Sequence, residues 1–586
     1  MLSLQRSIRN IIVTIEAHPR ASMWYTALFA VIYYMLVALQ GLDYADEGFS
    51  LTFYQQIFSH PEDVEYLFLY YLTGLLGGVW ELLFGGWGNY GFRLFFALVS
   101  GCNVLVAFSI LRRYLPVSTV LLGCLACILW PGLCLYYFNH DCLTVLLFLL
   151  SVWALLRGIE QKPVWLYLAG FLLMLNVFTR LPNATAFVLV LLPLVDAVYS
   201  GAHWRAGVNM LRIMAGMAVG LAVMCGVMLL LGHQSVFLSA LEAPFVMSGD
   251  SSDTHSIANI LSSYAYSYKS IITITIYGFL VALVYVASTQ LIKVKGISLI
   301  AGVCCVAMLY GLLSRNAYGM WGAVTSGTVI YMLSLYKDRS RVLLGITSLV
   351  FLLLIPVGGD SYNNVCNSCM WLGMPLLVSL FRQPVKWDVS FRGSYGRVWR
   401  IGLDAVNKRH LCYIAGVAFL LYVVMQSCCY FDDGSKIYKL YRPATVGRVT
   451  TYTTRERAEI TEDVVAAIKA HKIEGDYLLV FDNAPMLHYL TGLKPYLGSP
   501  WGTFWGERMF EDRLFRSENS PRPLPLIAVP RFYYKDLSPV NYFDVAEWPR
   551  MAGKAEVLLR FMRRNGYREV YSDPYILLYV PYDGVV

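Results

Sequence analysis

The sequence predicts a polytopic α-helical membrane protein that ends in an α/β domain. Of the 586 residues, 57% are hydrophobic and only 14% are charged, whereas soluble domains carry about 25% charged residues. Long apolar runs recur from residue 22 to residue 429, and the rest of the chain is polar and contains prolines. These observations predict a transmembrane part, residues 1–429, and a C-terminal domain, residues 430–586.

The basic residues are typical of topology signals and do not indicate a nucleic-acid partner. The net charge is +8, but the positive residues collect in short segments between apolar runs, and such segments face the cytoplasm. Arg6, Arg9 and Arg20 therefore place the N-terminus in the cytoplasm. No small-residue cleavage site follows the first apolar run, so we expect it to be retained as a span.

Thirteen apolar runs are expected to cross the membrane as helices. With this number, the basic clusters at 112–113, 337–341 and 382–410 all face the cytoplasm, and the chain ends outside. The runs lie near 22–41, 92–111, 117–138, 142–156, 164–179, 184–200, 210–231, 271–291, 297–313, 320–336, 342–357, 370–381 and 411–429.

One further apolar stretch, Tyr66–Gly86, is not expected to span the membrane. Counting it as a span would move every later basic loop to the outside. It also contains Glu81, five glycines and many aromatic residues. We therefore expect a helix that lies in the outer membrane interface, within a long first external loop from about residue 42 to 91.

The C-terminal domain alternates helical and strand patterns, which predicts an α/β fold. Helices are expected over Thr461–His471, capped by its threonine, and over Glu556–Asn565, closed by Gly566. No glycine-rich phosphate loop is present, so nucleotide binding is not expected there. The expected strands are Tyr477–Phe481, Leu524–Val529, Glu569–Tyr571 and Tyr575–Val580.

Three carboxylates stand directly after the first span: Asp43, Asp46 and Glu47. Acidic residues contribute little to topology, and acids near a membrane usually have a function. If the segment is helical, Asp43 and Glu47 share a face, with Asp46 beside them. Crowded carboxylates raise one another's pKa, which suits a general base that works near neutral pH.

Other polar residues gather at the external ends of the predicted spans. Asp141 lies where the third span ends and the fourth begins, within Asn139-His140-Asp141. Guanidinium groups bind phosphate bidentately, so cations at these positions suit a phosphate-bearing lipid headgroup. The candidate phosphate-binding residues are Arg93, Arg180, Lys269 and Arg315.

A divalent metal ion is a weaker hypothesis. The external-side histidines lack the spacing of a metal pair, so any site must be assembled from distant loops, with Glu62, His140, His255 and His488 as candidate ligands. Cys366 and Cys369 form a lone CxxC, for which a disulfide or two free thiols are better readings than zinc.

With these features the chain resembles the GT-C superfamily of membrane glycosyltransferases. The resemblance is to its bacterial branch, which contains protein O-mannosyltransferases and the aminoarabinose–lipid A transferase. The order of several short motifs carries the resemblance over nearly the whole chain. The matching segments are Asp46-Glu47-Gly48, Pro61 to Gly86, Arg93 to Leu98, Asp141, Arg180-Leu181-Pro182 and Val480–Gly492.

The resemblance implies an inverting transfer of a sugar from a polyprenyl-phosphate (undecaprenyl-phosphate) donor, outside a bacterial inner membrane. It implies that Asp46 is the base and that Arg93 and Arg180 lie near the donor phosphate. The acceptor is a glycolipid, polysaccharide or protein, and the sugar is a hexose or pentose. Because Asp43 precedes the motif, which of the three acids is the base stays open.

Two other classes of function compete with this reading. A lipid-linked polysaccharide polymerase or oligosaccharide ligase also uses donors outside the membrane, but such enzymes usually lack a terminal α/β domain. A transporter would be expected to place its polar residues near the bilayer midplane. Here the polar residues stand at the ends of the spans, so a transporter is the weakest alternative.

Overall fold

The computed structural model describes most of the chain, and the remaining residues are not discussed as structure. The described residues are 2–130, 135–249, 256–292, 294, 296–315, 318–357, 368–382, 387–392, 398–403, 405–427, 429–430, 433–434, 438–481, 484–544, 546–549 and 551–582. His255 and Cys366 therefore lie outside the described residues.

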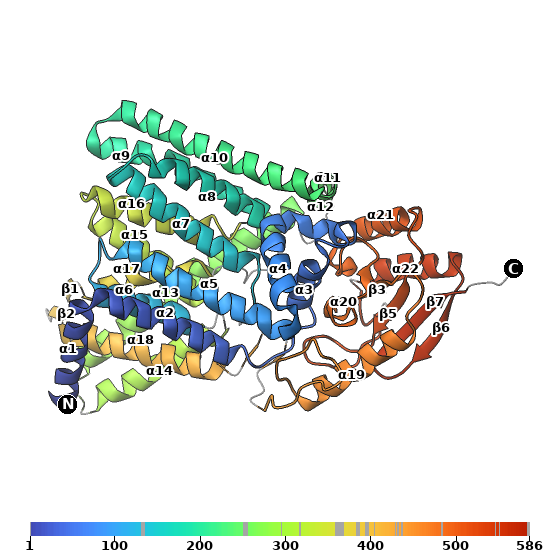
Figure 1. The fold of residues 1–586 in the computed structure, drawn as a ribbon. Helices are drawn as coiled ribbons and strands as arrows, with labels where there is room; N and C mark the ends of the chain where they lie inside the picture. Colours follow the sequence, from blue (N-terminus) through green and yellow to red (C-terminus); the bar gives the residue numbers. More distant parts are fainter. Residues whose placement is uncertain are drawn as a thin grey trace.

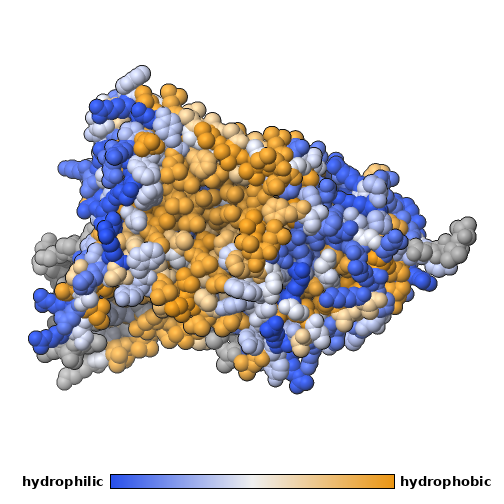
Figure 2. Space-filling model, viewed as in Figure 1, coloured by the Kyte–Doolittle hydropathy of each residue, from blue (hydrophilic) through white to orange (hydrophobic). Residues whose placement is uncertain are grey.

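A bundle of apolar helices forms the larger part of the molecule, and its long helices run side by side (Figure 1). The surface of the bundle carries a broad apolar band, with hydrophilic residues at one end and over the C-terminal region at the other (Figure 2). The helices are α1 (Leu2–Ala17), α2 (Pro19–Val37), α5 (Gly88–Leu111), α6 (Val117–Leu129), α7 (His140–Glu160), α8 (Trp165–Thr179), η3 (Leu181–Leu191), α9 (Leu192–Ser200), α10 (His203–Leu231), α11 (Gln234–Ala240), α12 (Glu242–Gly249), α13 (Ile257–Leu291), α14 (Ile297–Arg315), α15 (Tyr318–Ser334), α16 (Arg339–Leu353), η4 (Ser368–Met370), α17 (Gly373–Arg382) and α18 (Ala405–Gln426).

The polytopic helical architecture is confirmed. In the described part of the chain, eight helices are long and apolar enough to cross a membrane, and each of the thirteen predicted runs contains a helix. Some are shorter than predicted: the run 117–138 is helical only to Leu129, where the backbone of Trp130 turns extended. Strands β1 (Trp387–Arg392) and β2 (Val398–Leu403) pair antiparallel and form a small sheet in the basic segment. This sheet was not predicted.

The first loop folds into short helices at the end of the bundle next to the C-terminal region (Figure 1). It contains α3 (Asp46–Gln56), η1 (Pro61–Tyr70), α4 (Tyr71–Phe84) and η2 (Gly85–Trp87). The apolar stretch Pro61–Leu111 is therefore divided. With 14 residues, α4 is shorter than the roughly 20 residues that a membrane crossing needs, which agrees with the prediction that Tyr66–Gly86 does not span.

The C-terminal region is an α/β fold around a five-stranded sheet with the order β4-β3-β5-β7-β6. Strand β3 pairs in parallel with β4 and β5, whereas β7 pairs antiparallel with β5 and β6. The elements are α19 (Arg455–Ala470), β3 (Tyr477–Val480), α20 (Met486–Thr491), β4 (Lys494–Pro495), η5 (Gly502–Phe504), α21 (Glu507–Glu518), β5 (Leu526–Pro530), α22 (Ala552–Arg564), β6 (Tyr567–Ser572) and β7 (Ile576–Pro581).

All four predicted strands and both predicted helices are present, but both helices begin earlier than predicted: α22 begins at Ala552, four residues before Glu556, and α19 begins six residues before Thr461. Helix α19 begins at Arg455, because the Thr454 side chain accepts a hydrogen bond from the backbone N–H of Arg457 and caps the helix there. Thr461 lies in the helix interior, and its hydroxyl donates to the Arg457 carbonyl. Gly566 follows α22 with φ +62°, as expected for a helix-closing glycine.

Candidate active site

Asp43 lies before α3 and fixes the start of that helix. Its Oδ1 accepts from the Ala45 N–H at 2.7 Å, and its Oδ2 accepts from the Glu47 N–H at 2.9 Å. The side chain is fully buried. Its charge also stands next to the positive end of the helix dipole, which is a stabilising position for a carboxylate. Asp43 is therefore a capping residue, and the predicted shared helical face of Asp43 and Glu47 does not form.

Glu47 and Arg93 form a buried ion pair with a bidentate geometry. Arg93 Nε donates to Glu47 Oε1 at 2.8 Å and Arg93 Nη2 to Glu47 Oε2 at 2.7 Å, and both side chains are 0% exposed. The other three N–H groups of Arg93 donate to the carbonyls of Ala38, Gln40 and Gly41.

This arrangement corrects two of the sequence-based assignments. An arginine has five N–H donors, and in Arg93 all five are engaged by protein oxygens. The ring of Tyr430 covers the guanidinium at 4.1 Å. Arg93 thus has no donor left for a lipid phosphate, and Glu47 is held as its counterion. Both residues stabilise the turn between α2 and α3.

Asp46 is the carboxylate of the cluster that keeps solvent exposure. It is the first residue of α3 and is partly exposed, whereas Asp43 and Glu47 are fully buried. The charges of Asp46 and Asp43 both act on the phenol of the buried Tyr137, which places Asp46 within electrostatic reach of that ring. The three acids therefore have different environments, and of the three Asp46 is the one that solvent reaches.

Asp141 belongs to a second polar group at the start of α7. The Asn139 side chain caps this helix by accepting from the Cys142 N–H at 2.9 Å. Asp141 Oδ1 lies 3.7 Å from His140 Nε2, and this buried oxygen has no hydrogen-bond partner among the described residues. The His140 ring stacks on Tyr70, with centroids 4.4 Å apart.

Arg180 adds a buried cation to this group. It is 4% exposed and follows α8 in an extended conformation. Its Nη1 donates to the Ile355 carbonyl at 3.1 Å, and its charge acts on His140. Among the described residues it has no carboxylate partner, in contrast to Arg93. A buried guanidinium without a counterion is suited to bind an anion.

Tyr137 connects the first polar group to the second. Tyr137, which lies near Asp46, is four residues before Asp141, so their Cα atoms are at most about 14 Å apart at roughly 3.6 Å per residue. Tyr137 and Tyr70 were not singled out from the sequence. The aromatic run Tyr136-Tyr137-Phe138 before the polar triplet was the available signal.

The other two candidate phosphate ligands have weaker positions. Lys269 is exposed on the first half of α13, and no contact joins it to Arg180 in the described structure. Arg315 is the last residue of α14, and its side chain lies outside the described part. Both remain predictions.

Three of the four predicted metal ligands, Glu62, His140 and His488, lie in the described part of the chain, and they are not brought together there; the fourth, His255, lies outside it, so a metal site stays a prediction. His488 is buried in α20, where burial lowers the pKa of its ring to about 3 and its Nδ1 contacts the Leu493 carbonyl at 3.3 Å. His140 stacks on Tyr70, and Glu62 is exposed on η1. Among the described residues no three histidine, cysteine or acidic side chains come together as a metal site. No step is therefore assigned to a metal.

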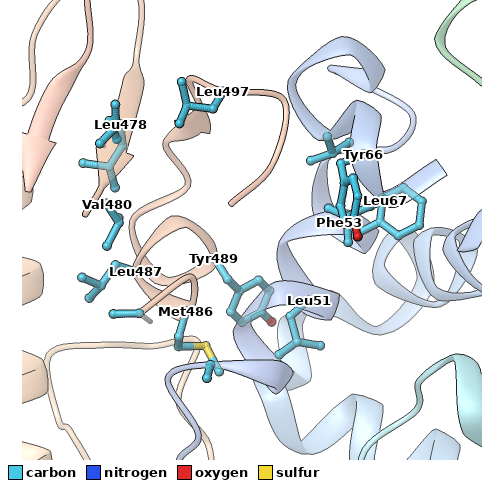
Figure 3. Packing of buried hydrophobic residues seen from close by; sticks show 14 of the residues in the cluster. Leu51, Phe53, Tyr66, Leu67, Leu478, Val480, Met486, Leu487, Tyr489 and Leu497 are labelled. Carbon is cyan, nitrogen blue, oxygen red and sulfur yellow. The ribbon is translucent and has the colours of Figure 1, made fainter. Parts of the chain in front are cut away.

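The C-terminal region holds α3 directly, through residues that the sequence did not reveal as partners. The Met486 N–H donates to the Tyr44 carbonyl at 2.9 Å, and Figure 3 shows Met486 and Tyr489 beside Leu51 of α3. Arg457 pairs with Asp433 at 2.9 Å and donates to the Leu42 carbonyl. The two motifs that open α3 and α20 are therefore in contact.

Gly48 makes this contact possible, so Gly48→Ala is expected to disrupt it. An added Cβ would lie 2.2 Å from the Met486 nitrogen and 2.3 Å from its Cα. Because these are backbone atoms, α3 and α20 must move apart, and overpacking of this kind typically costs about 1–3 kcal/mol. We expect a lower melting temperature in detergent and faster proteolysis between bundle and C-terminal region. Gly86→Ala is the control, since its Cβ would meet nothing within 4 Å; equal behaviour of the two variants would contradict the contact.

No protein-family model matches the chain, and no curated protein matches it. Among solved structures, ArnT from Cupriavidus metallidurans bound to undecaprenyl phosphate is similar with 12% sequence identity, a TM-score of 0.47, and coverage of 95% of this chain and 97% of that chain. The apo structure of the same protein gives 13% identity, a TM-score of 0.39 and the same coverage.

Because both TM-scores are below 0.5, the roles of individual residues depend on the side chains of this chain alone.

Proposed function

We propose that this chain is a membrane glycosyltransferase that transfers a sugar from a polyprenyl-phosphate donor, with Asp46 as general base. The observation that carries the proposal is that the charged residues differ in their partners and in their exposure to solvent. Asp43 caps a helix and Glu47 neutralises Arg93, whereas Asp46 is partly exposed to solvent. Arg180, in the group that contains His140 and Asp141, is a buried cation that donates to a backbone carbonyl.

The reaction is a single displacement. Asp46 accepts the proton of an acceptor hydroxyl or amine while that group attacks the anomeric carbon. The new bond forms as the bond from the anomeric carbon to the phosphate oxygen breaks, so the configuration inverts. The leaving polyprenyl phosphate gains negative charge, which the Arg180 guanidinium stabilises.

The topology that accompanies this proposal comes from the positive charges. The N-terminus lies in the cytoplasm, the thirteen apolar runs span a bacterial inner membrane, and the C-terminal region, from about residue 430, lies outside. The first loop and the Asp46 site then face the same external side. The contacts of α20 with α3 suggest that the C-terminal region covers the site.

The direct experiment is mass spectrometry of lipid-linked sugars and envelope glycans from a strain that lacks this gene. We expect one polyprenyl-phosphate sugar to accumulate and one sugar modification of a glycolipid, polysaccharide or protein to disappear. Unchanged donor and glycan pools would contradict the proposal. The same data would identify the sugar and the acceptor.

Arg180→Gln is expected to weaken the binding of undecaprenyl phosphate by about 10- to 100-fold. A hydrogen bond to a charged group contributes about 1.5–3 kcal/mol, and about 1.4 kcal/mol corresponds to a tenfold change. Binding is measured by thermal shift of the purified protein with added undecaprenyl phosphate. Arg157→Gln is the control, because Arg157 lies near the far end of α7, against Trp153. Equal affinity of the two variants would exclude Arg180 from the phosphate site.

A further inference from the structure

Two apolar cavities share a wall in the helix bundle, and α1, which lines one of them, lies at the end of the bundle farthest from the C-terminal region (Figure 1). The larger, of about 710 Å³, is enclosed by α6, α13, α14, α15, α17 and α18. The smaller, of about 500 Å³, lies between α1, α2 and α6. Leu122 and Arg382 line both cavities.

The side chains that line both cavities are mostly apolar, as in a site that binds hydrocarbon chains. Apart from Arg382 and Thr275, the larger is lined by apolar side chains and glycines, among them Phe279, Leu313 and Phe419. The smaller is lined by Ile12, Ile15 and Phe29, with hydroxyl groups toward its edge. Helix α6 separates the two, and Leu122 on this wall is 51% exposed. Each cavity therefore has the lining that a lipid chain needs.

Two charged residues, Arg382 and Glu16, lie beside the wall that the two cavities share. Arg382 Nη1 donates to Ser118 Oγ at 2.8 Å and to Thr119 Oγ1 at 2.7 Å. Among the described residues, Arg382 Nε and Nη2 have no hydrogen-bond partner. The Glu16 carboxylate accepts from the N–H groups of Val117 and Ser118 at the start of α6, and the charge of Arg382 acts on it.

We propose that this junction binds one two-chain phospholipid with a zwitterionic head, of the phosphatidylethanolamine class. The two chains diverge from one glycerol and enter the two cavities on either side of Leu122. The phosphate binds the remaining N–H groups of Arg382, and the ammonium group meets the Glu16 carboxylate. An anionic head such as phosphatidylglycerol would place only negative charge beside Glu16, so it fits less well. This site is independent of the proposed transfer reaction.

A third cavity supplies a matched control. It has about 450 Å³ and is lined by Val303, Tyr285 and His410, among others, with no arginine or lysine. Filling it should leave the phospholipid site intact. Val303→Trp and Leu122→Trp add the same side chain to an exposed apolar position of each site.

The test is the lipid content of the detergent-purified full chain, measured by native mass spectrometry and by analysis of extracted lipid. We expect about one phosphatidylethanolamine per chain in the natural protein and in Val303→Trp, and at least a tenfold loss in Leu122→Trp and Arg382→Gln. Added dioleoyl phosphatidylethanolamine should raise the melting temperature of the first two proteins only, and dioleoyl phosphatidylglycerol should have little effect.

Three outcomes would overturn the proposal. The first is equal retention by all four proteins. The second is loss in Val303→Trp as well, which would show general delipidation. The third is specific retention of phosphatidylglycerol or of a single-chain polyprenyl phosphate at this junction. The thermal shift keeps the test valid if Leu122→Trp folds poorly, because Arg382→Gln changes no apolar packing in either cavity wall.

Discussion

Arg93→Ala is expected to destabilise the protein by about 3–5 kcal/mol, the cost of breaking a buried ion pair on one side. The substitution would leave the Glu47 carboxylate buried without a counterion and the carbonyls of Ala38, Gln40 and Gly41 without their donor. Because these groups form the turn that leads to Asp46, transfer activity should be lost together with stability. Thermal unfolding in detergent measures the effect.

The partner substitutions make this prediction specific. Arg93→Lys should recover only part of the stability, since lysine has three donors where arginine has five. The double variant Arg93→Met/Glu47→Leu should be more stable than Arg93→Ala, because it removes both buried charges. A melting temperature of Arg93→Ala equal to that of the natural protein would show that the ion pair is not formed.

Asp46→Asn is expected to reduce sugar transfer by about 10²- to 10⁴-fold, the usual contribution of a general base. Asparagine keeps the size and hydrogen-bonding shape of the side chain but cannot accept the proton. Since Asp46 is partly exposed at the start of α3, the fold should be nearly unaffected. The modified glycan in a complemented strain and the melting temperature of the purified variant together test this.

The neighbouring acids provide the contrast. Asp43→Asn replaces one of the two oxygens that accept from the Ala45 and Glu47 N–H groups by an NH2 donor, and Glu47→Gln removes the charge that faces Arg93. Both variants should lose stability before they lose a catalytic group. If Asp43→Asn or Glu47→Gln abolished transfer at unchanged stability while Asp46→Asn did not, the base would be assigned wrongly.

The arrangement of helices and strands was largely predictable because it depends on local patterns. Long apolar runs predict membrane helices wherever they occur, and the short β-branched run Leu526–Pro530 became a fully buried strand. Helix limits were less predictable, as at α19, because Thr454 and Thr461 are equally good caps by composition. Which one acts depends on where the preceding chain turns.

The roles of the charged residues could be predicted only in part. Arg93 and Arg180 look alike in the sequence, each at the end of an apolar run. Arg93 is saturated by Glu47 and three carbonyls, whereas Arg180 has one carbonyl partner among the described residues. The difference arises because residues 38–41 turn back over Arg93, which is a tertiary contact. For the same reason, nothing local to Gly48 indicated that the Met486 backbone would pack against it.

The central claim, sugar transfer from a lipid-linked donor with Asp46 as the base, is tested most directly in living cells. The measurement is the amount of polyprenyl-phosphate sugar in a deletion strain that expresses either the natural chain or Asp46→Asn at equal levels. We predict that the donor accumulates with Asp46→Asn as it does in the empty deletion strain, and falls to its normal level with the natural chain. A normal donor level in cells with Asp46→Asn would contradict the account.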